Sequence, residues 1–302
     1  MLYLIIRMDI TIDKDRELNY EYNSLLRKTI NIFLIPILNI LPSSAQRLIK
    51  KTHKSAKDVI EEKTTYYALD ILYKNGIKEN AINFLTKFFH KIWFGTNNSK
   101  AVRNRLRLTK REIRNQLEVC LALDKDRIKI LSIASGSARA IIEILDEMRN
   151  RLKNKKIEVT FLDKDHKAIE YSQELASSKN LLSFFELKWV NDTAGSFFRS
   201  LDKDNTFDII EMVGLIDYFS DEKALQMFSH VNKHLSEDGL FITANISDNM
   251  ERPFVTKVID WSMIYRSAEQ LGEILSRASF NNNKMRLFYE PLKIHCVAVC
   301  IK

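Results

Sequence analysis

An apolar run near the middle of the chain ends in a cluster of small residues. The run spans residues 128–134, and a strongly helical segment spans residues 140–152. The small residues are Ala134, Ser135, Gly136, Ser137 and Ala138. A strand, a turn of small residues and a helix bring backbone N–H groups close to a nucleotide-like ligand, because larger side chains would block the approach. The pattern therefore predicts a ligand-binding turn.

An acidic residue at the end of the next apolar run strengthens this prediction. Residues 157–162 read as a second strand, and Asp163 follows it directly. A carboxylate at this place, somewhat over 20 positions after the turn, can accept hydrogen bonds from two ribose hydroxyls. The alternative is that Asp163 only caps the next helix, but Asp165 is better placed for that role. We therefore predict that Asp163 binds a ribose.

The glycine pattern bears on which nucleotide ligand is bound. A dinucleotide fingerprint has three glycines, whereas the residues from Ser137 to Arg139 that follow Gly136 include none. A pyrophosphate needs the close approach that glycines permit, and a methionine tail does not. A fourth strand at residues 207–213 leads into a turn that carries polar groups above the sheet. Both features favour S-adenosylmethionine over a dinucleotide.

The elements around this turn divide the chain in two. Residues 1–120 read mostly as helices, and residues 121–302 alternate strands with helices. Such alternation is typical of a parallel sheet with helices on both faces. The turn at Glu290 and Pro291 is too short to join parallel strands, so the last two strands form an antiparallel hairpin. We predict an α/β fold with a mostly parallel sheet and an α-helical N-terminal region.

Each expected element has a residue range. The first region has helices at residues 23–41, 44–75, 79–93 and 99–120, and its opening residues 2–13 are a strand or a disordered lead-in. The strands of the second region span residues 128–134, 157–162, 184–190, 207–213, 240–246, 284–289 and 294–301. Its helices span residues 140–152, 166–178, 195–201, 222–235 and 267–277, the last with a capping box of Ser267 and Gln270.

Residues 128–302 resemble a class I S-adenosylmethionine-dependent methyltransferase. The resemblance rests on F-D-I-I-E-M-V-G-L-I-D-Y-F-S-D (207–221), on H-L-S-E-D-G-L-F-I-T-A-N-I (234–246) and on the antiparallel C-terminal hairpin. More narrowly, I-A-S-G-S-A-R, G-L-I-D-Y-F-S-D, D-W-S-M-I-Y-R (260–266) and K-A-V-R-N-R-L-R-L (100–108) resemble a bacterial family whose members make 3-hydroxypalmitate methyl ester. This implies a Rossmann-like sheet under a helical substrate lid. It also implies methyl transfer to a small molecule, such as the carboxyl or hydroxyl of a fatty-acid-like compound.

The chain departs from the superfamily pattern at three positions. Ser132 stands where an acidic residue is usual, and Ala134 and Ala138 stand where glycines are usual. These changes keep the turn small, so cofactor binding is still expected. The amino group of the cofactor must then be held by another group, for which Glu211 and the backbone carbonyls near Ala134 are candidates.

The resemblance implies cofactor contacts on each side of the turn. The methionine end would be lined by Ala134, Ser135, Gly136 and Ser137, and the ribose would be held by Asp163. The adenine would be flanked by Lys164, and its amino group would be hydrogen-bonded by Asn191 and Asp192. The other side of the cofactor, which faces the acceptor, would be lined by Met212, Gly214 and Asp217. On the helix at residues 99–120, we expect Arg103 or Arg105 to turn inward and grip a carboxylate of the cofactor or of a fatty acid.

The chemistry itself demands little of the protein. A methyl group on a sulfonium is already electrophilic, so the protein mainly aligns the acceptor and excludes water. A carboxylate acceptor needs no general base. A hydroxyl or amine acceptor needs one, and Asp217, Tyr218 or Tyr265 could serve.

Composition leaves two other functions open. The net charge of +8 suggests an RNA or protein methyltransferase, and the unusual Ser132 and Ala138 suggest a non-catalytic binding module that keeps the fold. No aromatic residues interleave the arginines of the helix at 99–120, so a small-molecule acceptor is expected rather than nucleic acid.

Cysteine usage and hydropathy bear on location. The three cysteines and the scattered histidines form no metal-like cluster, so we expect no metal site, reduced thiols and a cytoplasmic protein. The longest apolar stretch, residues 30–41, is too short to span a bilayer and reads as a buried or an interfacial helix. Contact with a membrane surface therefore stays open, and the oligomeric state is not determined by the sequence.

Overall fold

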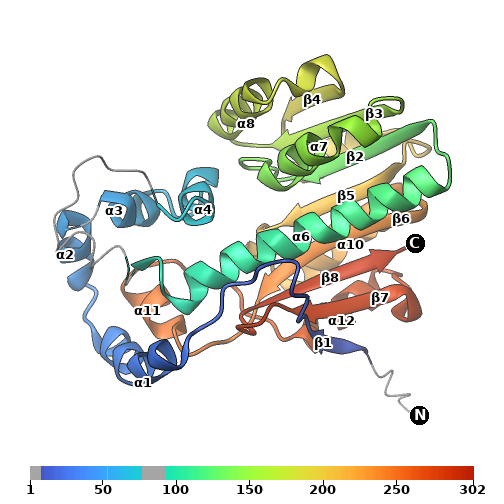
Figure 1. Ribbon diagram of the computed structural model, residues 1–302. Helices are drawn as coiled ribbons and strands as arrows, with labels where there is room; N and C mark the ends of the chain where they lie inside the picture. Colours follow the sequence, from blue (N-terminus) through green and yellow to red (C-terminus); the bar gives the residue numbers. More distant parts are fainter. Residues whose placement is uncertain (1–7, 53, 77–90, 92) are drawn as a thin grey trace, which may run out of the picture.

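The computed structural model describes residues 8–52, 54–76, 91 and 93–302. These residues form one eight-stranded sheet (Figure 1). The strands are β1 (Ile10–Ile12), β2 (Arg127–Ile133), β3 (Lys156–Asp163), β4 (Glu186–Asn191), β5 (Phe207–Val213), β6 (Leu235–Ile246), β7 (Met285–Tyr289) and β8 (His295–Ile301). Their order is β1-β7-β8-β6-β5-β2-β3-β4, and β8 runs antiparallel to both its neighbours while the other pairs are parallel. The predicted α/β sheet with an antiparallel C-terminal hairpin is confirmed.

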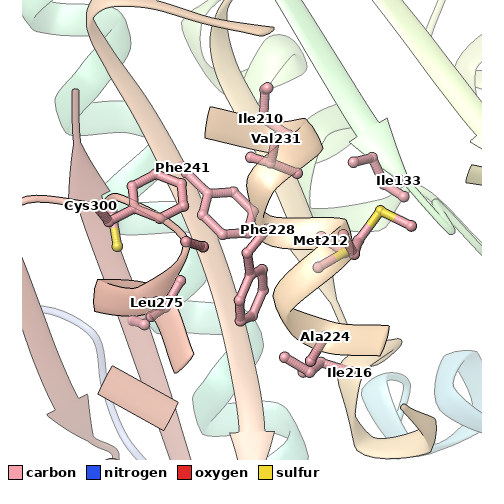
Figure 2. Close-up of a cluster of buried hydrophobic side chains, with 14 of the residues drawn as sticks. Ile133, Ile210, Met212, Ile216, Ala224, Phe228, Val231, Phe241, Leu275 and Cys300 are labelled. Carbon is pink, nitrogen blue, oxygen red and sulfur yellow. The ribbon is translucent and has the colours of Figure 1, made fainter. Parts of the chain in front are cut away.

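Helices cover both faces of the sheet because both faces are apolar. On one face, α6 (Asn97–Ala122) packs against β6 and β8, and α8 (His166–Ser178) packs against β3 and β4. α7 (Arg139–Leu152) lies between these two helices and contacts both. On the other face lie α9 (Ala194–Ser200), α10 (Asp221–His234) and α12 (Ala268–Arg277). Figure 2 shows part of this second core, where side chains of β5, α10 and β6 meet. The capping box of Ser267 and Gln270 is confirmed at the start of α12.

A second group of helices lies beyond one end of the sheet (Figure 1). It contains α1 (Leu25–Ile40), α2 (Ala45–Thr52), α3 (Lys54–Glu61), α4 (Tyr66–Tyr73) and α11 (Arg252–Lys257). The prediction of one helix over residues 44–75 was wrong. The chain breaks before α4 because Thr65 leaves the helical conformation and its hydroxyl accepts a hydrogen bond from the N–H of Tyr67, which caps a new helix. The expected helix at 79–93 falls largely on residues outside the described ranges.

Most of the other boundaries agree with the sequence, with two shifts. β6 begins earlier than predicted, at Leu235, because Leu235 pairs with Phe207 ahead of a register irregularity. β4 begins later, because residues 181–183 form a short 3₁₀ helix. α11 was not predicted. Within the described ranges no single helix is long and apolar enough to cross a membrane. One pair of helices, Leu25–Ile40 and Ala45–Lys51, is long and apolar enough when taken together, but the two are bent by 114° relative to each other.

The turn between β2 and α7 has an unusual backbone. Ala134, Gly136 and Ala138 have φ values of 51°, 54° and 51°, in the left-handed region. That conformation costs an alanine roughly 1–2 kcal/mol, because its Cβ crowds the neighbouring carbonyl, and it costs glycine almost nothing. The turn therefore keeps a glycine-like shape at two positions that carry alanine.

This strain predicts that Ala134→Gly stabilises the protein. Relief of the left-handed strain outweighs the greater unfolded-state freedom of glycine, for an expected net gain of about 0.5–1 kcal/mol. Ala140→Gly, in the first turn of α7, is the matched control and should cost up to about 1 kcal/mol. Urea unfolding of both variants gives the comparison, and a loss of stability in Ala134→Gly would contradict the assignment of strain.

Candidate active site

Two neighbouring hollows open where the strands of the sheet end. The turn hollow, of about 510 Å³, is lined by residues 134–141 together with Glu211 and Val213. The apolar hollow, of about 750 Å³, is lined by Gly214, Asp217 and Tyr218, which follow β5, and by residues of α3, α4, α6 and α11. Leu69 of α4 lines both. The carboxyl ends of parallel strands meet at one edge of a sheet, which explains why both hollows lie there.

Asp163, the last residue of β3, is hydrogen-bonded to the turn that lines this hollow. Its Oδ2 accepts a hydrogen bond from the N–H of Gly136 at 2.8 Å, and its Oδ1 accepts one from the N–H of Asp165 at 2.9 Å. Burial raises the pKa of this carboxyl above its usual value, although these two bonds oppose the shift. A carboxylate offers about four acceptor positions, so two stay available for the hydroxyls of a ligand.

The residues predicted to surround an adenine lie beside Asp163. Asn191 pairs with Asp163 in the sheet, and its side-chain amide donates to the carbonyl of Asp163 at 3.0 Å. The N–H of Asp192 donates to the same carbonyl at 3.1 Å. Asp165 caps α8, as expected, and Lys164 between the two acids is exposed. The structure therefore brings Asp163, Lys164, Asn191 and Asp192 together.

The acidic residue missing from the end of β2 has a counterpart on the neighbouring strand. Ser132 of β2 and Glu211 of β5 are direct partners in the sheet, and the Ser132 hydroxyl donates to Glu211 Oε2 at 2.6 Å. Glu211 Oε1 accepts from the N–H of Val213 at 3.1 Å. Burial raises the pKa of Glu211 to about 7. A carboxyl group that changes charge near neutrality thus faces the turn hollow.

Met212, between Glu211 and Val213, points the other way. Its side chain is fully buried in the core between β5 and α10, beside Ile133 and Ala224 (Figure 2). Successive side chains on a strand face opposite sides of the sheet, so Met212 cannot share a face with Glu211. The expectation that Met212 lines the cofactor site is therefore corrected: its neighbours Glu211 and Val213 line the hollow instead.

The apolar hollow contains a small buried polar group. Its walls are mainly Val59, Leu72, Val102, Phe254, Val255 and Ile259. Among them lie the side chains of Arg105, Asp217 and His295, which are only 2%, 3% and 3% exposed. Gly214 borders Arg105 closely, since a Cβ there would lie 3.7 Å from its Nη2. A cavity with apolar walls and a few buried polar groups is typical of a small-molecule site.

Arg105 is held only by long contacts. Its Nη1 lies 4.0 Å from Asp217 Oδ2 and 3.5 Å from His295 Nδ1, its Nη2 lies 3.4 Å from the Tyr73 hydroxyl, and its Nε has no hydrogen-bond partner among the described residues. Burial and the neighbouring guanidinium lower the pKa of His295 well below its usual value, so this ring is neutral. Arginine keeps its charge in proteins. A cation with spare donors therefore faces the hollow.

Arg103 differs from Arg105 in its contacts. The structure therefore distinguishes two arginines that the sequence left as alternatives for binding a carboxylate. Its Nε and Nη2 donate to the two oxygens of Glu21 at 2.6 and 2.7 Å, and Nη2 also donates to the carbonyl of Phe94 at 2.8 Å. This bidentate pair occupies the guanidinium of Arg103. Of the two arginines, Arg105 is the one with donors available for a ligand.

The three candidate bases differ in position. Asp217 and Tyr218 line the apolar hollow, and burial raises the pKa of both, that of Tyr218 to about 12. The Tyr218 hydroxyl also accepts a hydrogen bond from Trp261 Nε1 at 2.7 Å. Tyr265 lines neither hollow and packs against Ala101 and the guanidinium of Arg252.

Several residues that line the two hollows or support them were not predicted from the sequence. His295 looked like an ordinary strand residue, and Tyr66 and Tyr73 of α4 like part of a longer helix. Tyr66 covers the turn so closely that a Cβ at Gly136 would lie 3.3 Å from its own Cβ. Glu251, which accepts hydrogen bonds from the N–H groups of Asn97 and Asn98, fastens the start of α6. The position of Glu251 just before Arg252 and Pro253 suggests a cap for the helix that follows it, α11. Nothing in the sequence indicates that it caps α6 instead.

The raised pKa of Glu211 predicts a pH effect on stability. The folded protein holds this proton up to about pH 7, whereas the unfolded chain releases it near pH 4.5, so the contribution of Glu211 to stability falls as pH rises between these values. Glu211→Gln should remove up to about 3 kcal/mol of that fall. Urea unfolding at pH 5 and pH 8 measures it, with Glu174→Gln on the exposed face of α8 as control. Identical pH profiles of wild type and Glu211→Gln would contradict the assignment.

Comparison with known proteins identifies the fold. A possible exported protein from Bordetella parapertussis superposes with a TM-score of 0.62 at 15% identity, covering 79% of each chain. Magnesium protoporphyrin IX methyltransferase from Synechocystis PCC 6803, with bound SAH, gives 0.50 at 11% identity, covering 82% of this chain and 99% of that one. The S-adenosylmethionine-dependent methyltransferase SibL gives 0.50 at 13%, covering 82% and 69%. A search of the curated proteins gave no match.

The two methyltransferase structures share their Rossmann-like fold with this chain, and at 11% and 13% identity the likeness shows the fold alone. The family model described as "Putative methyltransferase" matches residues 62–301, which includes α4, every residue that lines the two hollows except Val59, and every strand except β1. The match covers well over half of the chain, so this protein belongs to that methyltransferase family.

Proposed function

We propose that the protein transfers a methyl group from S-adenosylmethionine to the carboxylate of an acceptor with an apolar, fatty-acid-like body. The observation that carries this proposal is the buried guanidinium of Arg105 in the apolar hollow, next to the turn hollow. Family membership supports methyl transfer, and the resemblance to methyltransferases that make 3-hydroxypalmitate methyl ester supports the acceptor class.

The turn hollow is where the chain would bind the cofactor. Asp163 would accept from the ribose hydroxyls, with Asn191 and Asp192 beside it for the adenine. Ala134 to Ser137 would line the methionine part, and Glu211 would face its ammonium group. A buried carboxylate beside an ammonium is stabilised in its charged form, which fits a group whose pKa lies near 7 in the free protein.

The apolar hollow would hold the acceptor. Arg105 would bind and orient its carboxylate, His295 would donate from Nε2, an atom without a partner among the described residues, and the apolar walls would cover the acyl chain. The bound cofactor supplies an electrophilic methyl group, to which a carboxylate oxygen bonds as the C–S bond breaks with its electron pair left on sulfur, giving a methyl ester and S-adenosylhomocysteine.

This reaction needs no proton acceptor, and the three candidate bases are poorly arranged to act as one. Tyr218 keeps its proton at neutral pH because its pKa is raised to about 12, and Tyr265 does not line the hollow. Asp217 is the remaining candidate base for a hydroxyl acceptor, but it lies beside Arg105 and its Oδ1 accepts from the N–H of Ile246 at 2.8 Å. Its arrangement suits a residue that positions Arg105.

Cofactor binding is tested first, by calorimetric titration with S-adenosylmethionine and S-adenosylhomocysteine. Asp163→Asn keeps the shape of the side chain and removes its charge, and should weaken binding roughly tenfold or more, since charge-assisted hydrogen bonds contribute about 1.5–3 kcal/mol. Asp204→Ala, in an exposed loop, should bind like wild type. A folded wild-type protein that binds neither compound would overturn the proposal and favour a non-catalytic relative.

The acceptor is tested by steady-state kinetics with 3-hydroxypalmitate. Arg105→Lys keeps the charge and loses the planar pair of donors, so the KM for the acid should rise about tenfold or more. Inhibition by the matching uncharged amide should change little, because it lacks the carboxylate. Arg107→Lys, on the same helix and bonded to Glu21 and Asn104, is the control. Equal effects on acid and amide would show that Arg105 has only a structural role.

A further inference from the structure

Helix α1 presents a stripe of large apolar side chains to solvent. Leu26, Ile30, Phe33, Ile37 and Ile40 are 72%, 43%, 69%, 54% and 80% exposed. They follow each other at alternating steps of four and three residues, which places them along one face of the helix. Single exposed apolar residues are ordinary on proteins, but a contiguous stripe marks an interaction surface.

The opposite face of α1 is attached to the body of the protein. Asn31 and Ile35 are buried, and Leu38 packs against the cluster that contains Phe254 of α11. Asn39 donates to the carbonyl of Met250 at 2.8 Å and accepts from the N–H of Phe254 at 3.1 Å. The inner face therefore defines how α1 lies, and the exposed stripe is a fixed outer face of the molecule.

Positive charge accompanies this stripe. From Tyr22 to Lys57 the chain has no Asp or Glu, and its basic residues are Arg27, Lys28, Arg47, Lys50, Lys51, Lys54 and Lys57. Five of these are exposed, namely Lys28, Arg47, Lys51, Lys54 and Lys57. Figure 1 shows α1, α2 and α3 together at one end of the molecule, far from β4 and α8. Lys50 and Lys57 lie 3.6 and 4.0 Å from the carboxylate of Glu61, so part of this charge is paired. The apolar stripe and an excess of positive charge thus share one end.

Charge and length together select the partner. A second copy of the chain, docked by two-fold symmetry, would place the same cations opposite each other, which is unfavourable. A nucleic acid would match the charge but not the aliphatic stripe. An anionic bilayer surface offers both phosphates and acyl chains. With 16 residues, α1 is about 24 Å long, shorter than the hydrocarbon core of about 30 Å, and its bend of 114° to α2 suits a helix lying in the interface.

We propose that α1 and the basic segment after it dock the protein onto the surface of an anionic phospholipid bilayer, with the Leu26–Ile40 stripe inserted among the acyl chains. α1 packs on α11, and Phe254 and Val255 of α11 line the apolar hollow. Docking therefore places the hollow close to the membrane surface. Membrane binding does not require that the proposed methyl transfer takes place, so the two can fail separately.

The test is flotation of the full chain with vesicles of phosphatidylcholine alone or mixed with phosphatidylglycerol. Wild type should float with the mixed vesicles and release as salt is raised to about 1 M. Phe33→Ser/Ile37→Ser should reduce binding roughly tenfold or more through lost apolar burial. Arg47→Gln/Lys51→Gln should reduce it by a similar factor through lost attraction to the anionic surface.

The control variants change similar residues elsewhere. Leu182→Ser removes an apolar side chain that is 52% exposed beyond α8, and Lys167→Gln/Lys203→Gln removes two exposed charges. Both should bind like wild type. Since the altered stripe residues are exposed, the variants should keep the thermal unfolding temperature of wild type.

Insertion is read separately with a fluorescent label. Cys120, Cys296 and Cys300 are fully buried, so a dye that senses polarity can be attached to Phe33→Cys or to Leu182→Cys alone. The emission should shift to the blue on mixed vesicles only for the label at position 33. Absence of wild-type flotation, equal binding to both vesicle types, or a dimer in light scattering that Phe33→Ser/Ile37→Ser abolishes while vesicles are not bound, would overturn the proposal.

Discussion

The buried carboxylate of Asp70 connects helix α4 to helices α7 and α8, which cover the sheet. Both hollows depend on this connection, because it fixes the position of α4. Asp70 lies in α4 and is 1% exposed. Its Oδ1 accepts from Arg139 of α7 at 2.6 and 3.0 Å, and its Oδ2 accepts from Tyr171 of α8 and from Lys74, both at 2.7 Å. A buried carboxylate is costly to separate from the cations and donors that pair with it, so the cluster holds α4 in one place. α4 in turn supplies walls to the turn hollow and to the apolar hollow.

A second buried charge shapes the apolar hollow. Arg105 is almost completely buried, yet its contacts to Asp217, His295 and Tyr73 are all 3.4 Å or longer. Arg266, equally buried, shows the contrast: it donates to Asn245 Oδ1 at 2.8 Å and to the carbonyls of Ile216 and Phe219, so it fixes the loop after β5. Buried charges are costly unless they are paired and hydrogen-bonded. The incomplete set of bonds at Arg105 is therefore the kind of arrangement that a bound carboxylate completes.

The apolar runs and their spacing were enough to predict most of the sheet. Residues 207–213 were predicted and found as a strand, and the short turn at Glu290 correctly predicted the antiparallel pair at the end of the chain. The helical region was harder, because helical periodicity continues through Thr65 although the hydroxyl of that residue starts a new helix. Met212 shows a similar limit. Its neighbours in the sequence line the hollow, but the pleat of the strand turns its side chain into the core.

By itself the sequence determined the order of strands and helices, and with it the position of Asp163 beside the turn at Gly136. Both follow from local patterns, since apolar periodicity sets the element and the carboxyl ends of parallel strands share an edge. Only the tertiary structure decided that Ser132 hydrogen-bonds Glu211, that Arg105 rather than Arg103 faces the hollow, and that His295 meets Arg105. The physical reason is that a buried polar group takes its partner from whatever packing brings within about 3 Å, and that partner can lie anywhere in the chain.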